Sequence, residues 1–256
     1  MAEQKKIGII KEELKAAEEF MLPDFIKRYQ EDSREGVRRL VQQAQRRLEK
    51  LEAERQRIRA LKHYEYEYES CGLICGIDEA GRGPLAGPVV AGAVILPKDC
   101  EILYINDSKK LTAAKREELY EVIMEQAVAA GIGIVSQDRI DQINILQATY
   151  EAMREAISNL GVTPDILLND AVTIPGVEIR QVPIIKGDAK SISIGAASIL
   201  AKVTRDRMMV EYDGLMPEYG FAVHKGYGTA AHIAAIQKYG PSPIHRRSFL
   251  KSLYKE

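Results

Sequence analysis

The sequence contains no apolar run that approaches the length needed to span a bilayer, which is about 20 residues. The first residues, 1–6, are polar and contain no secretory apolar segment, so we expect a cytoplasmic protein that does not contact a membrane. Cysteine is scarce, because Cys71, Cys75 and Cys100 form no even set and no Cys-x-x-Cys motif. They favour free thiols in a reducing compartment, since a zinc site at Cys71 and Cys75 lacks two further nearby ligands.

An excess of charge of one sign is also absent from the chain as a whole. The 36 Lys and Arg residues balance 37 Asp and Glu residues, which by itself argues against a nucleic-acid partner. The distribution is uneven, however: residues 36–62 contain nine Lys or Arg against three Glu, and residues 221–256 contain six against one Glu. Two basic segments that flank a carboxylate-rich middle suit a polyanion held over a metal site.

Glycine is missing between Gly36 and Gly72, and this region has helical periodicity. Apolar residues recur three or four positions apart on both sides of Pro23, which interrupts the pattern. We therefore predict a helical N-terminal extension, residues 1–70, and a second domain, residues 71–256. The extension could be a helical hairpin or short coiled coil, and its positive charge also suits a grip on substrate. The alternating Tyr and Glu of residues 64–69 mark the boundary, although that alternation is also typical of a strand.

Strands and helices mix after residue 71. Short apolar runs predict strands at residues 73–77, 89–96, 131–135, 166–168 and 182–185. Helical patterns with start and stop signals cover residues 115–130, 145–159, 191–212 and 229–239. Early strands followed by strands that alternate with helices predict an α/β fold, with a mixed sheet and helices on both faces.

Carboxylates follow several of the predicted strands. Asp78 and Glu79 end the first apolar run, Asp170 follows another, and Asp188 lies just past a third. Adjacent carboxylates raise each other's pKa, and divalent cations that prefer oxygen ligands relieve the repulsion. If the strand ends meet, four carboxylates can hold two metal ions for phosphoryl chemistry. The alternative is that these aspartates cap helices or turns, and Asp188 is a serious candidate for capping because it lies three residues before Ser191.

A glycine-rich turn follows the first pair of acids. Gly81 and Gly83 let the backbone approach a ligand closely, and Arg82 between them could meet a phosphate. The other interpretation is a tight turn between two strands. A kinase or nucleotidase is disfavoured, because the turn lacks the Gly-Lys-Ser/Thr of a phosphate-binding loop.

Residues 78–88, DEAGRGPLAGP, resemble the opening motif of ribonuclease HII, the type 2 ribonuclease H. Further blocks resemble that family in the same order along the chain: 106–111 (NDSKKL), 186–188 (KGD), 193–203 (SIGAASILAKV), 224–229 (HKGYGT) and 243–249 (PIHRRSF). Any single block is weak, whereas the ordered set from about residue 76 to 249 is specific.

The resemblance implies a ribonuclease H-like mixed sheet with C-terminal helices, and an N-terminal helical extension is known in bacterial members. It implies a monomeric, metal-dependent endonuclease that cuts RNA in RNA–DNA hybrids and cuts duplex DNA 5′ of a single embedded ribonucleotide. Such cleavage leaves a 3′-hydroxyl and a 5′-phosphate and serves to remove ribonucleotides from DNA. The cofactor is then Mg²⁺ or Mn²⁺, with two ions during catalysis.

The resemblance also assigns roles to residues. The metal ligands and catalytic residues are Asp78, Glu79, Asp170 and Asp188. Gly81, Arg82 and Gly83 match the residues that read the 2′-hydroxyl, the group that marks RNA. Lys109 matches a lysine that contacts phosphate, and Tyr227 matches a tyrosine that packs on the sugar after the ribonucleotide. Without the family, Lys109 is a solvated loop charge and Tyr227 a half-buried aromatic residue.

One residue departs from the family pattern, and two other functions remain open. Asn169 stands where the family usually has an apolar residue, which could alter hydration near Asp170. Ribonuclease HIII is the first alternative, but its opening motif resembles Gly-Thr-Gly, its fourth acid is usually Glu, and its N-terminal domain is rich in strands. The second is a non-enzymatic nucleic-acid binder in which the acids serve as caps.

Three histidines, His224, His232 and His245, lie in different predicted elements and share no metal-ligand spacing. We therefore interpret them as structural or surface residues rather than as metal ligands.

Overall fold

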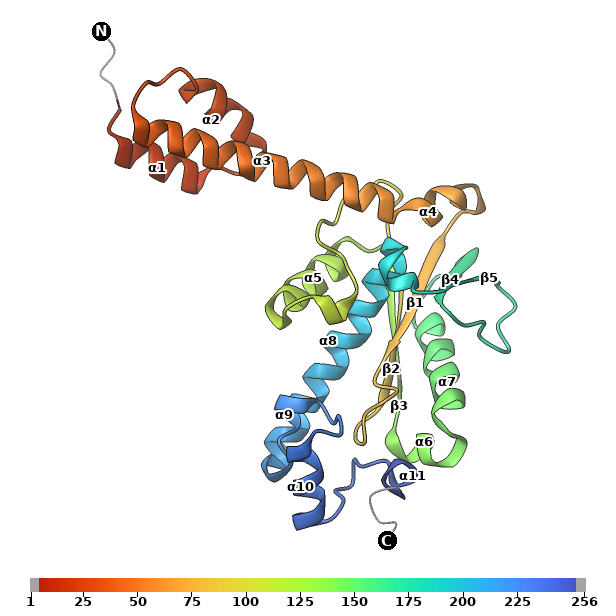
Figure 1. The fold of residues 1–256 in the computed structure, drawn as a ribbon. Helices are drawn as coiled ribbons and strands as arrows, with labels where there is room; N and C mark the ends of the chain where they lie inside the picture. Colours follow the sequence, from red (N-terminus) through yellow and green to blue (C-terminus); the bar gives the residue numbers. More distant parts are fainter. Residues whose placement is uncertain (1–4, 252–256) are drawn as a thin grey trace. The chain divides into compact units, whose positions relative to one another are not determined.

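The computed structural model describes residues 5–251 and divides the chain into two compact units, residues 1–59 and 60–256 (Figure 1). The first unit is helical. It comprises α1 (Ile7–Ala16), the 3₁₀ turn η1 (Glu19–Met21), α2 (Leu22–Tyr29) and most of α3 (Glu35–Leu61). Its core is one apolar cluster drawn from all three α-helices. Pro23 lies in the first turn of α2, where a missing N–H is harmless, so the interruption in the pattern is the start of a helix.

The division between the units falls after residue 59 rather than near residue 70. The Tyr–Glu stretch is not a strand: it forms α4 (His63–Glu67) and is bonded to the second unit. The buried Lys62 Nζ donates to the carbonyl oxygen of Lys98 at 2.7 Å. Glu65 Oε1 accepts a hydrogen bond from Ser191 Oγ at 2.5 Å. These long-range bonds tie residues 60–70 to the α/β unit, which composition alone does not reveal.

A five-stranded mixed sheet forms the centre of the second unit. Its strands are β1 (Ile74–Ala80), β2 (Val89–Ile95), β3 (Ala129–Val135), β4 (Ile166–Asp170) and β5 (Arg180–Ile184). The order across the sheet is β3-β2-β1-β4-β5, in which β1, β2 and β3 are antiparallel and β1, β4 and β5 are parallel. The predicted α/β class with a mixed sheet is confirmed.

Helices and turns complete the second unit. The helices are α5 (Ala113–Gln126), α6 (Gln137–Ile143), α7 (Ile145–Ser158), α8 (Ile192–Leu215), α9 (Phe221–His224), α10 (Ala230–Tyr239) and α11 (Arg247–Leu250). The 3₁₀ turns are η2 (Glu69–Cys71), η3 (Ser108–Lys110), η4 (Gly187–Ala189) and η5 (Pro217–Tyr219). Among residues 5–251, no helix is long and apolar enough to cross a membrane.

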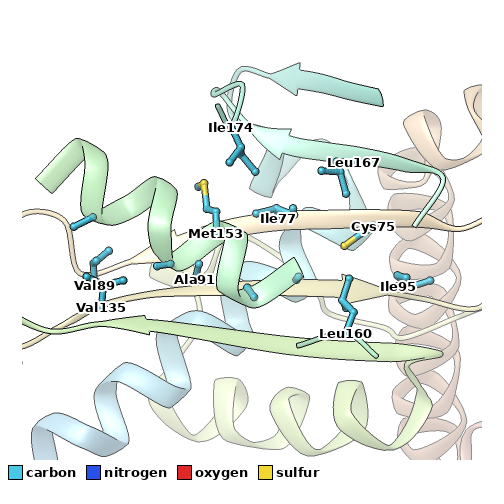
Figure 2. Packing of buried hydrophobic residues seen from close by; sticks show 14 of the residues in the cluster. Cys75, Ile77, Val89, Ala91, Ile95, Val135, Met153, Leu160, Leu167 and Ile174 are labelled. Atoms are coloured by element: carbon cyan, nitrogen blue, oxygen red, sulfur yellow. The ribbon is translucent and has the colours of Figure 1, made fainter. Parts of the chain in front are cut away.

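Two helices pack on opposite faces of the sheet at very short range (Figure 1). A Cβ added to Gly76 in β1 would lie 2.0 Å from the Ser193 carbonyl carbon of α8, and one added to Gly133 in β3 would lie 1.9 Å from the Ala152 carbonyl oxygen of α7. Only glycine permits this approach. Figure 2 shows the core on the α7 side, where Met153 lies over the strands between Ile77 and Ala91.

One predicted boundary was wrong. We predicted a helix to residue 130, but α5 ends at Gln126 and β3 begins at Ala129. The alanines favour helix by propensity, yet Ala129 pairs with Ile95 of β2 and Ala130 pairs with Val94. Pairing along the whole of β2 therefore overrides the local preference, and the strand extends to its full length.

The cysteines are free thiols, as predicted. Cys75 is fully buried in β1, and burial raises the pKa of its thiol to about 12. Such a thiol is inert at neutral pH, so Cys75 acts as a packing residue.

Candidate active site

Three of the predicted acids meet where β1 and β4 end side by side. The two strands are parallel, and Ile77 of β1 pairs with Asn169 of β4. The next residue of each strand is an aspartate, so Asp78 and Asp170 lie at the same level of neighbouring strands. Glu79 follows directly, and the side chain of Asp78 is almost completely buried.

The fourth acid reaches this strand end through a turn. After β5 the chain passes through Lys186, which has a left-handed φ of 59°, and enters η4, which contains Asp188. The turn is fastened to the site because Gly187 N donates to Asp170 Oδ1 at 2.7 Å. Asp188 is not the cap of α8: that position belongs to Ser191, whose Oγ accepts from Ile194 N at 3.2 Å. Asp188 is therefore left facing the other acids.

Burial and mutual repulsion make these acids a coupled group. Burial, then the neighbouring charges of Glu79 and Asp170, raise the pKa of Asp78 well above its usual value. Burial also raises the pKa of Glu79, although its ion pair with Arg82 at 3.2 Å opposes this. The pKa of Asp188 is raised by burial and then by Asp107 and Asp170.

The donor set suits a hard divalent cation, because it consists of crowded carboxylates whose charge lacks compensation. The side chains are not in a finished coordination geometry. Within residues 5–251, no group of three or more His, Cys, Asp or Glu residues is arranged so that it could hold a metal ion. The structure thus brings the four predicted acids to one strand end as a repelling group, and their assignment as ligands stays a prediction.

Two neutral residues beside the acids were not predicted as part of the site. Ser198 of α8 hydrogen-bonds to Asp78 and lies 3.0 Å, oxygen to oxygen, from Ser108 of η3. Asn169 faces away from Asp170, because successive side chains of a strand alternate. Its Nδ2 donates to Gln181 Oε1 at 2.8 Å, so this residue braces the loop between β4 and β5.

The glycine turn lies directly after β1. Gly81 has a left-handed φ of 94°, and a Cβ there would lie 2.1 Å from Arg205 Nε. Gly83 is different, because a Cβ there would meet only Tyr227 Cε1, at 3.9 Å. The protein therefore requires glycine at position 81 for its own packing, whereas it leaves open space at position 83. The side chain of Arg82 is 44% exposed beside this space.

Two buried arginines hold the turn from behind, and neither was predicted. Arg205 of α8 donates to the carbonyl oxygens of Ala86 and Pro88, and Arg246 donates to those of Gly81, Arg82, Gly87 and Pro88. Burial, and then repulsion from Arg205, lower the pKa of Arg246 to about 9, so its guanidinium stays charged at neutral pH. Because these carbonyls turn inward to the arginines, the loop is held in one conformation over residues 81–88.

The two other predicted substrate residues flank the acids. Lys109 is exposed in η3, and its charge attracts both Glu79 and Asp188. Tyr227 is 43% exposed and lies opposite Gly83. Both are therefore close to the strand end, on different elements.

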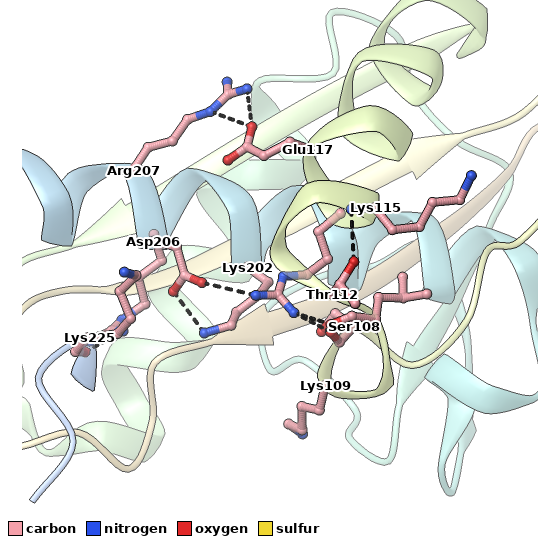
Figure 3. Close-up of polar contacts among 12 residues, drawn as sticks. Ser108, Lys109, Thr112, Lys115, Glu117, Lys202, Asp206, Arg207 and Lys225 are labelled. Carbon is pink, nitrogen blue, oxygen red and sulfur yellow. Dashed lines mark hydrogen bonds and ion pairs between the residues drawn. The ribbon is translucent and has the colours of Figure 1, made fainter. Parts of the chain in front are cut away.

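A groove of about 810 Å³ runs from Tyr227 between α5, α8 and the end of α9. Its cationic lining residues are Arg116, Lys202, Arg207 and Lys225. Figure 3 shows that two of these cations are held in place: Lys202 Nζ lies 2.7 Å from Asp206 Oδ1, and Arg207 lies 2.6 Å from Glu117. The basic character of residues 221–256 was a sequence signal for Lys225, but α5 and α8 carried no such excess.

Comparison with known proteins agrees with the motif order. The model of the family described as "Ribonuclease HII" matches residues 75–252, and that of "Ribonuclease HII N-terminal domain" matches residues 6–69. The chain is 67% identical to the ribonuclease HII of Lachnoclostridium phytofermentans over 226 residues, which is 88% of this chain and 89% of that protein. It is 52% identical to the ribonuclease HII of Clostridioides difficile over 98% of this chain and 99% of that protein.

Solved structures have the same fold. The ribonuclease H2 of Pyrococcus horikoshii aligns with a TM-score of 0.58 and 29% identity, covering 68% of this chain and 92% of that one. A ribonuclease HIII solved in complex with Mn²⁺ aligns with a TM-score of 0.54 and 15% identity, covering 66% of this chain and 63% of that one. The second likeness shows the fold alone.

Proposed function

The chain belongs to the ribonuclease HII family, whose members are ribonuclease H endonucleases, and on this premise we propose that it incises duplex DNA 5′ of a single embedded ribonucleotide. It also cuts RNA in RNA–DNA hybrids, leaves a 3′-hydroxyl and a 5′-phosphate, and serves to remove ribonucleotides from DNA. The observation that carries the proposal is the meeting of Asp78, Glu79 and Asp170 at one strand end, beside a turn with open space at Gly83.

The four carboxylates are the catalytic residues in this proposal, and they hold Mg²⁺ or Mn²⁺, two ions during catalysis. Bound divalent ions activate a water and stabilise the leaving oxygen in phosphodiester hydrolysis. Ser198 holds Asp78, and Gly187 N holds Asp170, so that each aspartate keeps one oriented oxygen for a ligand. The raised pKa values of Asp78, Glu79 and Asp188 reflect the charge that a cation would neutralise.

The substrate is recognised by its 2′-hydroxyl at the glycine turn. The backbone of Gly81 and Gly83, with the side chain of Arg82, contacts this group, and the open space at Gly83 admits the minor groove. Tyr227 packs on the following sugar, where an added hydroxyl would clash with its ring. Lys109 contacts a phosphate, which positions the duplex without reading its sequence.

The N-terminal unit contributes affinity for the duplex. Arg39, Arg46 and Lys50 are exposed on α3 at spacings of seven and four residues, so they form one stripe, here called the basic stripe. The opposite side of α3 carries the apolar residues of the core, which fixes the outward direction of the stripe. The protein acts as a cytoplasmic monomer; its unbridged thiols suit a reducing compartment.

The alternatives are less well supported. Ribonuclease HIII fits poorly because residues 7–61 are helical rather than strand-rich, and the position of its usual glutamate is Asp188. A non-enzymatic binder is set aside by membership of a nuclease family, and the cap of α8 is Ser191 rather than an acid of the group.

The proposal is tested by mapping products on a DNA duplex with one ribonucleotide, in Mg²⁺ or Mn²⁺. We expect Asp78→Asn and Asp170→Asn each to lower cleavage by a factor of about 100 or more, because each removes a charged ligand. Asp138→Asn, a change at an exposed aspartate in α6, is the matched control and should keep full activity. Unaltered cleavage by either site variant, or products with other ends, would contradict the assignment.

The basic stripe is tested separately by replacing its three residues with glutamine. Affinity for an RNA–DNA duplex should fall, and the slope of log K against log salt should become shallower by about 2–3, because about one counterion is released per contact. A variant with glutamine at Lys11, Lys27 and Arg28, which are exposed on α1 and α2, removes the same charge elsewhere in the unit. Equal salt slopes for the two variants would remove the stripe from the proposal.

A further inference from the structure

Three of the four histidines gather in one buried group, although they come from different elements. The rings of His224 and His232 stack with centroids 4.2 Å apart, and the ring of His245 lies 5.1 Å from that of His232. His232 and His245 have 0% and 2% of their surface exposed. The ring of Phe221 packs against both of these at 5.5 and 5.7 Å.

The hydrogen bonds determine where each proton of this group lies. Ser242 N–H donates to His245 Nδ1 at 2.9 Å, so this nitrogen carries a lone pair and the ring's proton is on Nε2. His245 Nε2 lies 3.0 Å from His232 Nε2, and one proton between them means that His245 donates and His232 accepts. The proton of His232 is then on Nδ1, which donates to the carbonyl oxygen of Tyr227 at 2.9 Å. The result is one directed chain of bonds from Ser242 to Tyr227.

The same logic applies to His224, which braces the other side of the Tyr227 turn. Gly226 N–H donates to His224 Nδ1 at 3.1 Å, so His224 Nε2–H donates to the carbonyl oxygen of Tyr219 at 2.7 Å. The turn itself is strained, because Lys225 has a left-handed φ of 51°. A conformation of this kind persists only where surrounding bonds hold it.

The turn is also bonded to the loop that carries the glycine turn. Leu85 N donates to the carbonyl oxygen of Gly226 at 2.8 Å, and Arg205 Nη1 donates to that of Lys225 at 2.9 Å. Tyr227 is therefore placed opposite Gly83 by bonds from two directions: the loop on one side and His232 on the other.

Only the neutral rings satisfy this arrangement. A second proton on His245 would face the N–H of Ser242, and one on His232 would face the N–H of His245. The ionisable residues on the elements around the rings are His224, Lys225, Tyr219, Tyr227, Asp213, Lys238 and Arg246. Within residues 5–251 no carboxylate is bonded to the three rings, and Asp213 accepts instead from Ala222 N. Burial, and then the neighbouring His232, lower the pKa of His245 to about 4.

We propose that His232 and His245 are positioning residues that fix Tyr227 against the sugar on the 3′ side of the ribonucleotide, and so set the preference for deoxyribose there. The proposal rests on the proposed function of Tyr227 and goes beyond it by naming what holds the ring. The rings do not touch substrate. Loss of either bond releases the Tyr227 carbonyl, and discrimination at that sugar falls more than cleavage itself.

The test compares two duplexes that have either deoxyribose or ribose after the embedded ribonucleotide. We expect the ratio of their kcat/KM values to fall about tenfold in His232→Leu, which matches the loss of one or two buried hydrogen bonds. His232→Asn keeps a donor near Nδ1 and should restore most of the ratio. His63→Leu, at the exposed fourth histidine in α4, should leave the ratio unchanged. An equal fall of kcat/KM on both duplexes in His232→Leu would show a merely structural role and overturn the proposal.

A second measurement does not depend on cleavage. Imidazole ¹⁵N spectra of the wild-type protein at neutral pH should show His232 protonated on Nδ1 and His245 on Nε2. The opposite tautomers, or charged rings, would overturn the directed chain whatever the activity. Failure of the wild-type protein to cut at an embedded ribonucleotide would instead refute the proposed function and leave the tautomer result to decide the chain of bonds.

Discussion

Replacement of Arg246 by alanine is expected to lower the free energy of unfolding by about 3–5 kcal/mol. The guanidinium donates to four carbonyl oxygens, and that of Pro88 also accepts from Arg205, so three acceptors lose their arginine bond. Hydrogen bonds to a charged group contribute about 1.5–3 kcal/mol each, a total of about 4.5–9 kcal/mol. Relief from burying an arginine without a carboxylate partner offsets several kcal/mol of this loss.

Urea denaturation followed by circular dichroism measures the effect. Arg247→Ala changes the next residue, whose side chain is exposed, and should stay within about 0.5 kcal/mol of the wild type. Arg246→Lys keeps the charge but replaces a planar fork by a point charge, so it should fall between the two. Cleavage by Arg246→Lys should show a raised KM, because the turn of Gly81 and Gly83 is less firmly held.

The reasoning would be refuted if Arg246→Ala unfolded within about 1 kcal/mol of the wild type. In that event the inward carbonyls of residues 81–88 would be held by the surrounding packing alone, and the buried charge would have no part in shaping the turn.

Two further predictions concern the glycine turn and the N-terminal unit. Gly83→Ala should leave stability within about 0.5 kcal/mol of the wild type, because its Cβ meets only Tyr227, yet lower cleavage about a hundredfold by obstructing the substrate; Gly81→Ala should destabilise by about 1–3 kcal/mol, since its φ is positive and Arg205 is in the way, and the opposite ranking of stabilities would refute this. Hydrogen bonds from Arg34 hold the pKa of Asp32 at about 2, below its usual 3.8, so this pair stabilises the fold above that usual value and the contribution is lost as pH falls toward 2; thermal melts should therefore show a shallower acid slope in Asp32→Asn, and an unchanged slope would exclude the pair.

Much of the fold followed from local pattern. The mixed sheet and the helical N-terminal region were predictable because apolar runs of five to seven residues and three-to-four periodicity dominate their segments. Helix caps were equally local: Thr112, Asn144 and Thr229 lie where their side chains accept backbone N–H groups. The start of β3 and the unit boundary were not predictable, since each depends on partners distant in sequence.

The meeting of the acids was predictable in outline only. Their place after apolar runs indicated strand ends, but the parallel pairing of β1 with β4, which brings Asp78 level with Asp170, has no local signal. Arg205 and Arg246 escaped notice for a related reason: an arginine in a sequence reads as surface charge, and only the folded chain surrounds it with carbonyls. The histidine group was interpreted as structural, and its directed hydrogen bonds became visible only from the geometry.

Helix α8 connects nearly every part of this arrangement through one continuous backbone. Its first turn lies on Gly76, Ser198 reaches Asp78, Lys202 lies in the groove, and Arg205 fastens the loop. An α-helix turns by about 100° per residue, so a single inserted or deleted codon between Ser198 and Arg205 would swing every later side chain a quarter turn off target. This stretch of the gene therefore tolerates changes of letter far better than changes of length, whereas the loop between β4 and β5 is free to grow or shrink.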